Sequence, residues 1–461
     1  MNQGDEKDEA PARSRTPHSK EFLEYISSGW AQRPDASTKT DPVASFAKQR
    51  REKVAVKFSG KVVVIESGAP KTRSNDTEYR YRPHSAFAHL TGWGSRTVPD
   101  SVLVIDARQA QKDILFLRPT AGKDSDEFFA NSAIGEFWVG ARPTLQEVSK
   151  LLDIETRDLK ELESYLAEVD SINLEDEALA EFVSELRLVK DSFEIEQMRL
   201  AVAASIKGFE DIVKVLPSAI GKPRGERVIE TAFFARARQE GNDLGYDTIA
   251  AAGKNACVLH WISNDGEVRP SDLVLVDAGV EVDSLYTADI TRTLPVSGKF
   301  TDAQKEIYLA VLEAADAAFA VAKPGVKFRE VHQAAMKVIA QKSADWGILP
   351  VSAEESLEEE KQFHRRWMVH GTSHHLGLDV HDCAQARKEM YLDADLEEGM
   401  VFTIEPGLYF HADDLLAPEH FRGIGVRIED DVLVTKDGVE NLSAKLPRTP
   451  EEVEKWMASL S

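Results

Sequence analysis

Cysteine is scarce in this sequence, which contains only Cys257 and Cys383 among 461 residues. Two cysteines cannot form the disulfide framework of a small secreted domain, and such usage suits a reducing compartment. The sequence also lacks any apolar run near the roughly 20 residues of a membrane-spanning helix, and no basic segment followed by an apolar stretch opens it. These absences argue against a membrane protein and predict a cytoplasmic location.

Basic residues are also fewer than acidic residues. The chain has 56 Lys and Arg against 79 Asp and Glu, which gives a formal net charge of −23 at pH 7. Contacts with a nucleic-acid backbone or an anionic membrane would be repulsive on average, so we expect neither as a partner. Hydrophobic residues make up 42% of the chain, which is enough to form the cores of more than one domain.

The order of patterns along the chain predicts a tail and two domains. Residues 1–19 are charged and poor in large apolar side chains, so we expect a disordered tail. Residues 20–187 combine β-rich runs (KVVVIESG, FAHLTGW, SVLVIDA and DILFLR) with helical stretches such as 145–152, which predicts an N-terminal α/β domain. Residues 188–461 alternate helices with hairpin-like strand returns, which predicts an α+β domain with a curved, mainly antiparallel sheet.

Within the second domain, capping signals predict where helices begin. Asp191 with Glu194, and Thr301 with Gln304, have the spacing of a capping box. Strands are expected at four apolar runs: 273–277, 290–296, 400–409 and 426–434. The acidic run 352–361 is expected to be a solvated loop or helix face.

Ionisable residues interrupt these apolar strands. Because alternate residues of a strand point to the same side, Arg427 and Glu429 should project together. Carboxylates interrupt apolar runs at three further positions: Asp277, Asp289 and Glu405. A buried carboxylate needs a counter-charge, so we expect either bound cations or salt bridges with Arg292 or Arg427.

Histidines gather in one short segment, at positions 370, 374, 375 and 381. The segment is not the HExxH motif of zinc proteases, and Gly371 and Gly377 favour a loop or strand edge. Carboxylates combined with imidazole suit Mn²⁺ or a similar ion better than a thiolate-preferring metal. Two such ions that share carboxylates can lower the pKa of a water and direct hydroxide at an amide carbonyl.

Five ordered motifs resemble those of aminopeptidase P, the Xaa-Pro aminopeptidases of the pita-bread metallopeptidases: DLVLVDAG, YTADITRT, HGTSHHLGLDVHD, GMVFTIEPGLY and RGIGVRIEDD. The resemblance covers most of the chain from about Arg80 and is weakest in the first domain. It implies a small N-terminal α/β domain followed by a pita-bread catalytic domain, the creatinase/aminopeptidase-like fold. It also implies a homodimer or homotetramer.

The resemblance further implies two divalent metal ions, Mn²⁺ being the expected species, held by Asp277, Asp289, His374, Glu405 and Glu429. Of these, Asp289 and Glu429 would bridge the ions, and Glu405 would also deprotonate the attacking water. The remaining catalytic positions are His260, His370 and His381, which would contact the scissile carbonyl or leaving group, and Arg427, which would orient carboxylates. For His260, the alternative is a core histidine beside Trp261.

The implied reaction is the release of the N-terminal residue from peptides with proline in second position, by attack of a metal-bridging hydroxide on the X-Pro amide. Two alternatives stay open. A prolidase that cleaves only X-Pro dipeptides would carry the same ligands. A non-enzymatic peptide-binding module of the same fold would lack the complete ligand set.

Overall fold

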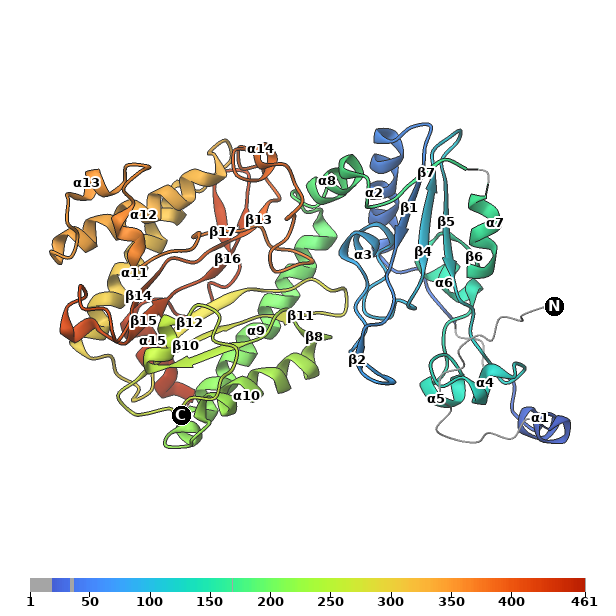
Figure 1. Cartoon of the computed structure of the whole chain (residues 1–461), viewed down its shortest axis with the longest axis horizontal. Coiled ribbons are helices and arrows are strands. Elements are labelled where there is room, and N and C mark those ends of the chain that lie inside the picture. Colours follow the sequence, from blue (N-terminus) through green and yellow to red (C-terminus); the bar gives the residue numbers. More distant parts are fainter. Residues whose placement is uncertain (1–18, 34–36, 168, 461) are drawn as a thin grey trace, which may run out of the picture.

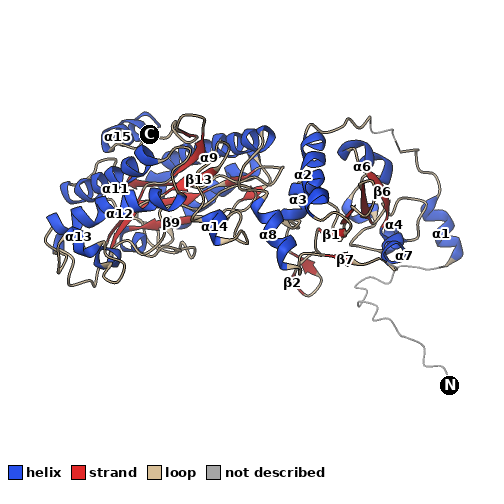
Figure 2. Cartoon of the chain, turned by 90° about the horizontal axis from the view of Figure 1, so that it is seen from above, coloured by secondary structure: helices blue, strands red, loops and turns tan. Residues whose placement is uncertain are grey.

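The computed structural model describes residues 19–33, 37–167 and 169–460. Two lobes lie side by side in both Figure 1 and Figure 2, an N-terminal lobe that ends with α8 (Glu177–Glu185) and a C-terminal lobe that begins with α9 (Ser192–Ala219). The expected tail at 1–19 lies, apart from Ser19, outside the described residues.

The N-terminal lobe is built on a five-stranded sheet of order β6-β5-β4-β1-β7. The three central strands pair antiparallel, whereas β6 and β7 run parallel to their neighbours. The strands of this lobe are β1 (Val62–Glu66), β2 (Thr72–Ser74), β3 (Thr77–Glu78), β4 (Val102–Asp106), β5 (Lys112–Leu117), β6 (Glu155–Asp158) and β7 (Ser171–Ile172). Its helices before α8 are α1 (Lys20–Ser27), α2 (Val43–Lys57), α3 (Ser85–Thr91), α4 (Glu127–Ala130), α5 (Glu136–Val139), α6 (Leu145–Leu152) and α7 (Leu162–Leu166).

One expected strand of this lobe is wrong. The run FAHLTGW is not a strand but most of helix α3 and the turn after it. The side chain of His84 caps the start of α3, and Gly92, at φ 71°, ends it in the left-handed conformation that glycine favours. Every residue of α3 is buried, and a short helix buried on all sides has the same continuous apolar pattern as a buried strand.

In the C-terminal lobe, all pairs between the described strands are antiparallel. The strands are β8 (Asp243–Leu244), β9 (Ile249–Ala252), β10 (Leu273–Ala278), β11 (Val280–Glu281), β12 (Ile290–Pro295), β13 (Val401–Ile404), β14 (Gly407–Phe410), β15 (Ile424–Arg427), β16 (Asp430–Val434) and β17 (Val439–Asn441). The helices after α9 are α10 (Gly225–Glu240), α11 (Asp302–Val321), α12 (Phe328–Asp345), α13 (Ala353–Ser356), α14 (Lys388–Tyr391) and α15 (Pro450–Leu460).

Two of the four expected strands in this lobe are each divided. The run 400–409 forms β13 and β14, and the run 426–434 belongs to β15 and β16. Pro406 has no N–H to continue a ladder, and β13 pairs with β16 while β14 pairs with β15. Glu405 and Glu429 therefore lie at the breaks between strands.

The predicted capping boxes are confirmed, since α9 begins after Asp191 and α11 begins after Thr301. Val274 and Val276 of β10 belong to the same apolar cluster as α9 and α10. Because strand residues alternate, the opposite face of β10 carries Asp277.

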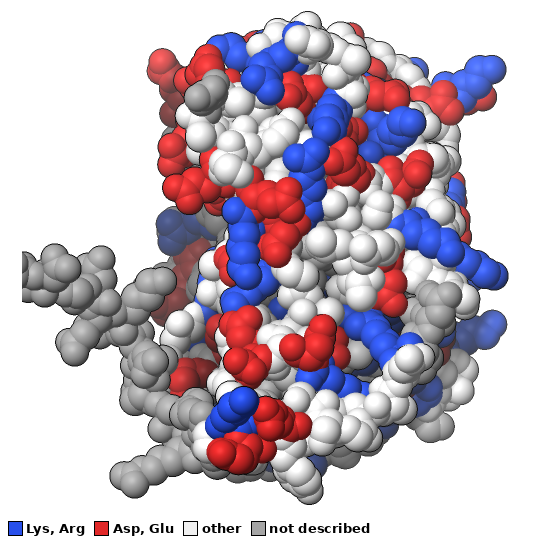
Figure 3. All heavy atoms as spheres, turned by 90° about the vertical axis from the view of Figure 1, so that its right-hand side faces the viewer, with Lys and Arg blue, Asp and Glu red and all other residues white. Residues whose placement is uncertain are grey.

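Charged side chains are distributed without one dominant sign over the face of the N-terminal lobe that Figure 3 shows. The acidic run 352–361 contains the short helix α13, and its glutamates are exposed, as expected for a solvated segment. Within the described ranges, no helix has the length and apolar character needed to cross a membrane.

The two lobes are joined through a buried carboxylate, Glu194. It lies 3.6 Å from the Arg50 guanidinium of α2 and 3.3 Å from His89 Nε2 of α3, and it accepts a hydrogen bond of 2.8 Å from the Tyr286 hydroxyl. Arg50 also donates to Asp191 at 2.7 Å. The start of α9 is thereby held against two helices of the N-terminal lobe.

We expect Glu194→Gln to destabilise the fold by about 3 kcal/mol, because it removes one partner of a buried ion pair. Burial alone would raise the pKa of Glu194, but His89 and Arg50 lower it below its ordinary value. Its contribution is therefore present above the unfolded-state pKa and is lost as pH falls through the folded-state pKa. Denaturant titrations at neutral and acidic pH should show the difference between wild type and variant shrinking on acidification.

The matched control is Glu440→Gln, which breaks a partly exposed pair with Arg199. It should cost no more than about 1 kcal/mol. Equal losses in the two variants would contradict the role of Glu194 at the junction.

Candidate metal centre

One cavity of about 550 Å³ in the C-terminal lobe gathers every site residue that the sequence suggested. Its walls include the five expected metal ligands and the four further expected catalytic residues: Asp277, Asp289, His374, Glu405, Glu429, His260, His370, His381 and Arg427. The remaining wall contains apolar side chains, among them Leu259, Ile262 and Val380. The cavity is therefore lined by acidic and histidine side chains together with apolar ones.

Strand pairing brings the carboxylates together. Asp277, in β10, lies opposite Thr291 of β12, and Asp289 immediately precedes β12. The backbone N–H of Glu429 donates to the carbonyl of Thr291 at 3.1 Å, which places Glu429 across from the same strand. The Glu405 N–H donates to the carbonyl of Thr372, so Glu405 lies next to the histidine segment.

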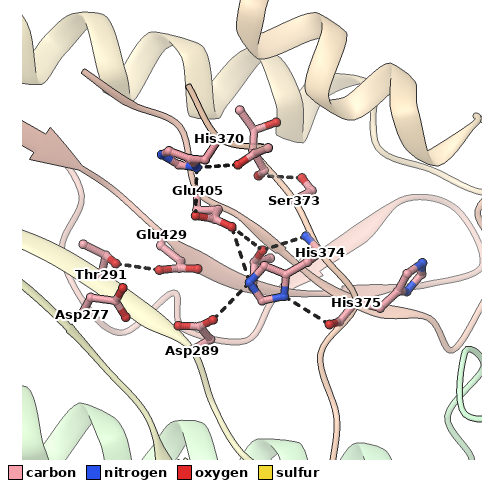
Figure 4. A network of polar contacts seen from close by, with 12 residues as sticks. Asp277, Asp289, Thr291, His370, Ser373, His374, His375, Glu405 and Glu429 are labelled. Carbon is pink, nitrogen blue, oxygen red and sulfur yellow. Dashed lines mark hydrogen bonds and ion pairs between the residues drawn. The ribbon is translucent and has the colours of Figure 1, made fainter. Parts of the chain in front are cut away.

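His374 lies between two carboxylates, as Figure 4 shows. Its Nε2 is 3.2 Å from Asp289 Oδ2 and 3.4 Å from Glu405 Oε1. One ligand atom each from Asp289, His374 and Glu429 lies within 4.8 Å of the others, a spacing that could hold a metal ion. The histidine segment itself is a loop that touches the sheet edge at His375, as the glycines indicated.

The other histidines differ in their surroundings. The Nδ1 of His370 is 3.5 Å from Glu405 Oε2, and its Nε2 is 2.8 Å from the Tyr409 hydroxyl. His381 packs edge-on against His374, with ring centroids 4.6 Å apart. His375 instead stacks on Phe328, away from the cavity. His260 is exposed, so the alternative of a core histidine is wrong.

The salt-bridge alternative holds for one arginine and not for the other. Arg427 is paired with Asp277 and lies 4.0 Å from Glu429. Arg292 instead pairs with Asp430 at 2.6 Å and donates to the backbone carbonyls of Thr291 and Glu429. Arg292 therefore neutralises none of the five expected ligands through its side chain.

Three further side chains contact the ligands, and two of them, Tyr246 and Asp431, were not anticipated from the sequence. The Tyr246 hydroxyl lies 2.6 Å from Asp277 Oδ1 and 2.5 Å from Asp289 Oδ1. The Thr291 hydroxyl donates to Glu429 at 2.6 Å, and the backbone N–H of Asp289 donates to Asp431. The alternation of residues from Asp289 into β12 indicates Thr291 on the same side as Asp289, but a tyrosine in the turn before β9 carries no such signal.

The cavity contains more buried carboxylates than cationic side chains to balance their charge. Burial raises the pKa of Asp277, Glu405 and Glu429, and neighbouring carboxylates add to the rise. Burial also opposes ionisation of Asp289, but its hydrogen bond with His374 lowers its pKa overall. Burial lowers the pKa of His370 to about 3, so this imidazole is neutral at pH 7.

This donor set fits divalent cations. Arg427 and a protonated His374 can offset only two of the four carboxylate charges, and a cation would relieve the repulsion among the others. Carboxylate oxygens with one imidazole are the ligands that ions such as Mn²⁺ accept, and Zn²⁺ also binds His and carboxylate.

Comparison with known proteins gives matches along nearly the whole chain. The model of metallopeptidase family M24 matches residues 196–436, and that of the aminopeptidase P N-terminal domain matches residues 47–174. The Xaa-Pro aminopeptidase 1 of Streptomyces coelicolor is 47% identical over 96% of this chain and 93% of its own length.

Solved structures of aminopeptidase P match the same fold. Aminopeptidase P from E. coli with the inhibitor Pro-Leu superposes with a TM-score of 0.79 at 30% identity, over 92% of this chain and 99% of the other. A Zn-substituted form of the E. coli enzyme in complex with product gives the same TM-score and identity, over 92% and 100%.

Proposed function

This chain belongs to metallopeptidase family M24, among the aminopeptidase P enzymes, and from that premise we propose that it is an Xaa-Pro aminopeptidase. It hydrolyses peptides that carry proline in second position and releases their N-terminal residue. The observation that carries the proposal is the single cavity in which all of the expected ligand and catalytic side chains meet.

Two divalent cations, Mn²⁺ being the expected species, would be held by Asp277, Asp289, His374, Glu405 and Glu429. The surplus of buried carboxylates over cationic side chains supports this assignment. When bound, such cations lower the pKa of water and polarise a carbonyl oxygen.

The side chains around the metal centre have separate roles in proton transfer, substrate binding and orientation. Glu405 accepts the proton of the attacking water, and its carboxylate lies within 3.5 Å of both His374 and His370 in the cavity. His260, His370 and His381 face the scissile carbonyl and the leaving nitrogen, where N–H donors stabilise developing charge. Arg427 fixes Asp277 and donates to the Tyr409 hydroxyl, which in turn contacts His370.

Recognition of proline follows from its chemistry. The X-Pro bond is a tertiary amide without an N–H, so an enzyme that reads the hydrogen bonds of an extended backbone loses one at this position. The free amino terminus bound beside the metal centre can replace that recognition. The apolar side chains in the cavity lining, among them Leu259, Ile262 and Val380, are suited to contact the pyrrolidine ring.

A prolidase would share this metal centre but accept only dipeptides. We expect the enzyme to hydrolyse an X-Pro-X tripeptide as well as or better than Gly-Pro. Initial rates with both peptides and added Mn²⁺ measure this directly, and turnover confined to the dipeptide would reassign the protein as a prolidase. A peptide-binding module without activity finds no support in the complete ligand set.

Further parts of the proposal concern organisation. The boundary between the N-terminal α/β domain and the catalytic domain lies near residue 188, between α8 and α9. The protein forms a homodimer or homotetramer, as the family resemblance implies. A cytoplasmic location is supported by two cysteines that are both free and buried.

A further inference from the structure

We propose that Glu226 is a positioning residue for the segment 253–266, which forms one wall of the cavity. This segment contributes Leu259, His260 and Ile262 to the wall. Glu226 does not itself line the cavity and contacts none of the expected metal ligands through the hydrogen bonds described below. Its effect on turnover rests on the proposed function, whereas its effect on the segment does not.

The carboxylate of Glu226 is fully buried in the first turn of α10. Its two oxygens accept four hydrogen bonds, two on each oxygen. Oε1 accepts from the Ala252 backbone N–H at 2.7 Å and from Asn255 Nδ2 at 2.8 Å. Oε2 accepts from the Trp261 indole at 2.7 Å and from the Gly266 backbone N–H at 2.6 Å.

Three of these four donors lie within the segment, and the fourth, Ala252, immediately precedes it. Ala252 and Asn255 lie where the chain enters it, Trp261 lies next to His260, and Gly266 lies where the chain leaves it. The Glu226 N–H also donates to the carbonyl of Gly266 at 3.2 Å. One carboxylate therefore fixes the entry, the middle and the exit of the segment that carries His260.

None of the four donors is a cationic side chain. The negative charge is instead stabilised by N–H groups and by the positive end of the α10 dipole. Removal of the acceptor would leave buried donors without partners, and the segment would have to move to hydrate them.

Two further features concern the position of this segment: the close approach of its backbone to Glu226, and a second hydrogen bond to β9. A Cβ at position 266 would lie 2.5 Å from Asn255 Nδ2 and 2.7 Å from Glu226 Cδ, so glycine permits the close approach. Asn264 holds the same segment against β9, because its Oδ1 accepts from the Ala250 N–H at 2.9 Å. With Asn264 in place, loss of Glu226 should displace the segment without detaching it.

We expect Glu226→Gln to lower kcat/KM for an X-Pro-X peptide at least tenfold while bound metal per chain stays at the wild-type value. In the glutamine side chain, an NH₂ group replaces one carboxylate oxygen. This group faces two N–H donors and cannot accept a hydrogen bond from either. Glu226→Asp keeps both acceptor oxygens on a shorter stem and should recover part of the loss. Glu240→Gln is the control, since Glu240 ends the same helix in surface pairs with Lys207 and Arg236.

A second readout does not depend on turnover. In the Zn²⁺-loaded protein with ¹⁵N-labelled tryptophan, the Trp261 indole N–H should exchange slowly and resonate downfield, because it donates to a carboxylate. Trp261→Phe identifies its resonance among the seven tryptophans. In Glu226→Gln this resonance should shift and exchange faster, while in Glu240→Gln it should not.

An unshifted Trp261 resonance in Glu226→Gln would overturn the proposal, as would wild-type kinetics or a loss of activity that follows a loss of metal. If the wild-type protein itself hydrolysed no X-Pro peptide, the proposed function would fail. The indole resonance would still decide the role of Glu226.

Discussion

Glu405→Gln is expected to lower kcat on an X-Pro-X peptide at least a thousandfold, which corresponds to about 4 kcal/mol of transition-state stabilisation. The amide is isosteric with the carboxylate but cannot accept the proton of the attacking water. In the structure, the Glu405 carboxylate lies within 3.5 Å of both His374 and His370, inside the cavity.

The measurement is steady-state kinetics at matched metal content, because Glu405 is also an expected ligand. Metal analysis of each preparation separates a lost base from a lost ion. The control is Glu398→Gln, an exposed position just before β13, which should keep wild-type kinetics. A Glu405→Gln enzyme that kept more than a tenth of the wild-type kcat would contradict the assignment.

Metal removal should have the second large effect. Dialysis against EDTA is expected to abolish activity, and added Mn²⁺ is expected to restore it. The same addition should raise the thermal unfolding midpoint, because the metal-free carboxylates repel one another and binding to the folded state alone stabilises it. At a free ion concentration a hundred times Kd, this stabilisation is about 2.7 kcal/mol.

A pair of variants tests where the ion acts. Asp289→Asn should lose both the activity and the Mn²⁺-dependent rise in unfolding temperature. Asp437→Asn, an exposed carboxylate after β16, should keep both. Full activity in a preparation shown by elemental analysis to be metal-free would refute a metal-dependent mechanism.

The sequence was sufficient for much of the fold, and the reasons are local. Capping boxes at Asp191 and Thr301 involve residues three apart, so they could be identified without tertiary information. The break between β13 and β14 was signalled only by Pro406, and the change of strand partner behind it depends on residues far along the chain. The run FAHLTGW was misassigned because burial on all sides removes the periodicity that separates helix from strand.

The candidate site shows the same limit. Its carboxylates could be identified because ionisable groups inside apolar strands are conspicuous. Tyr246 and Asp431 could not, because only the tertiary fold brings them within hydrogen-bonding distance of Asp277 and Asp289. Glu226 lies in a helix whose sequence gives no indication that the side chain reaches the segment 253–266.

The ligand set spans the chain from Asp277 to Glu429, with strands, two long helices and the histidine segment between them. Contacts of such large sequence separation are slow to form, because long loops must close before them. A polypeptide still emerging from the ribosome, or one that has lost its last strands to proteolysis, cannot assemble the centre. An incomplete chain should therefore be inactive. The peptidase activity of a preparation should be proportional to the number of fully folded molecules in it.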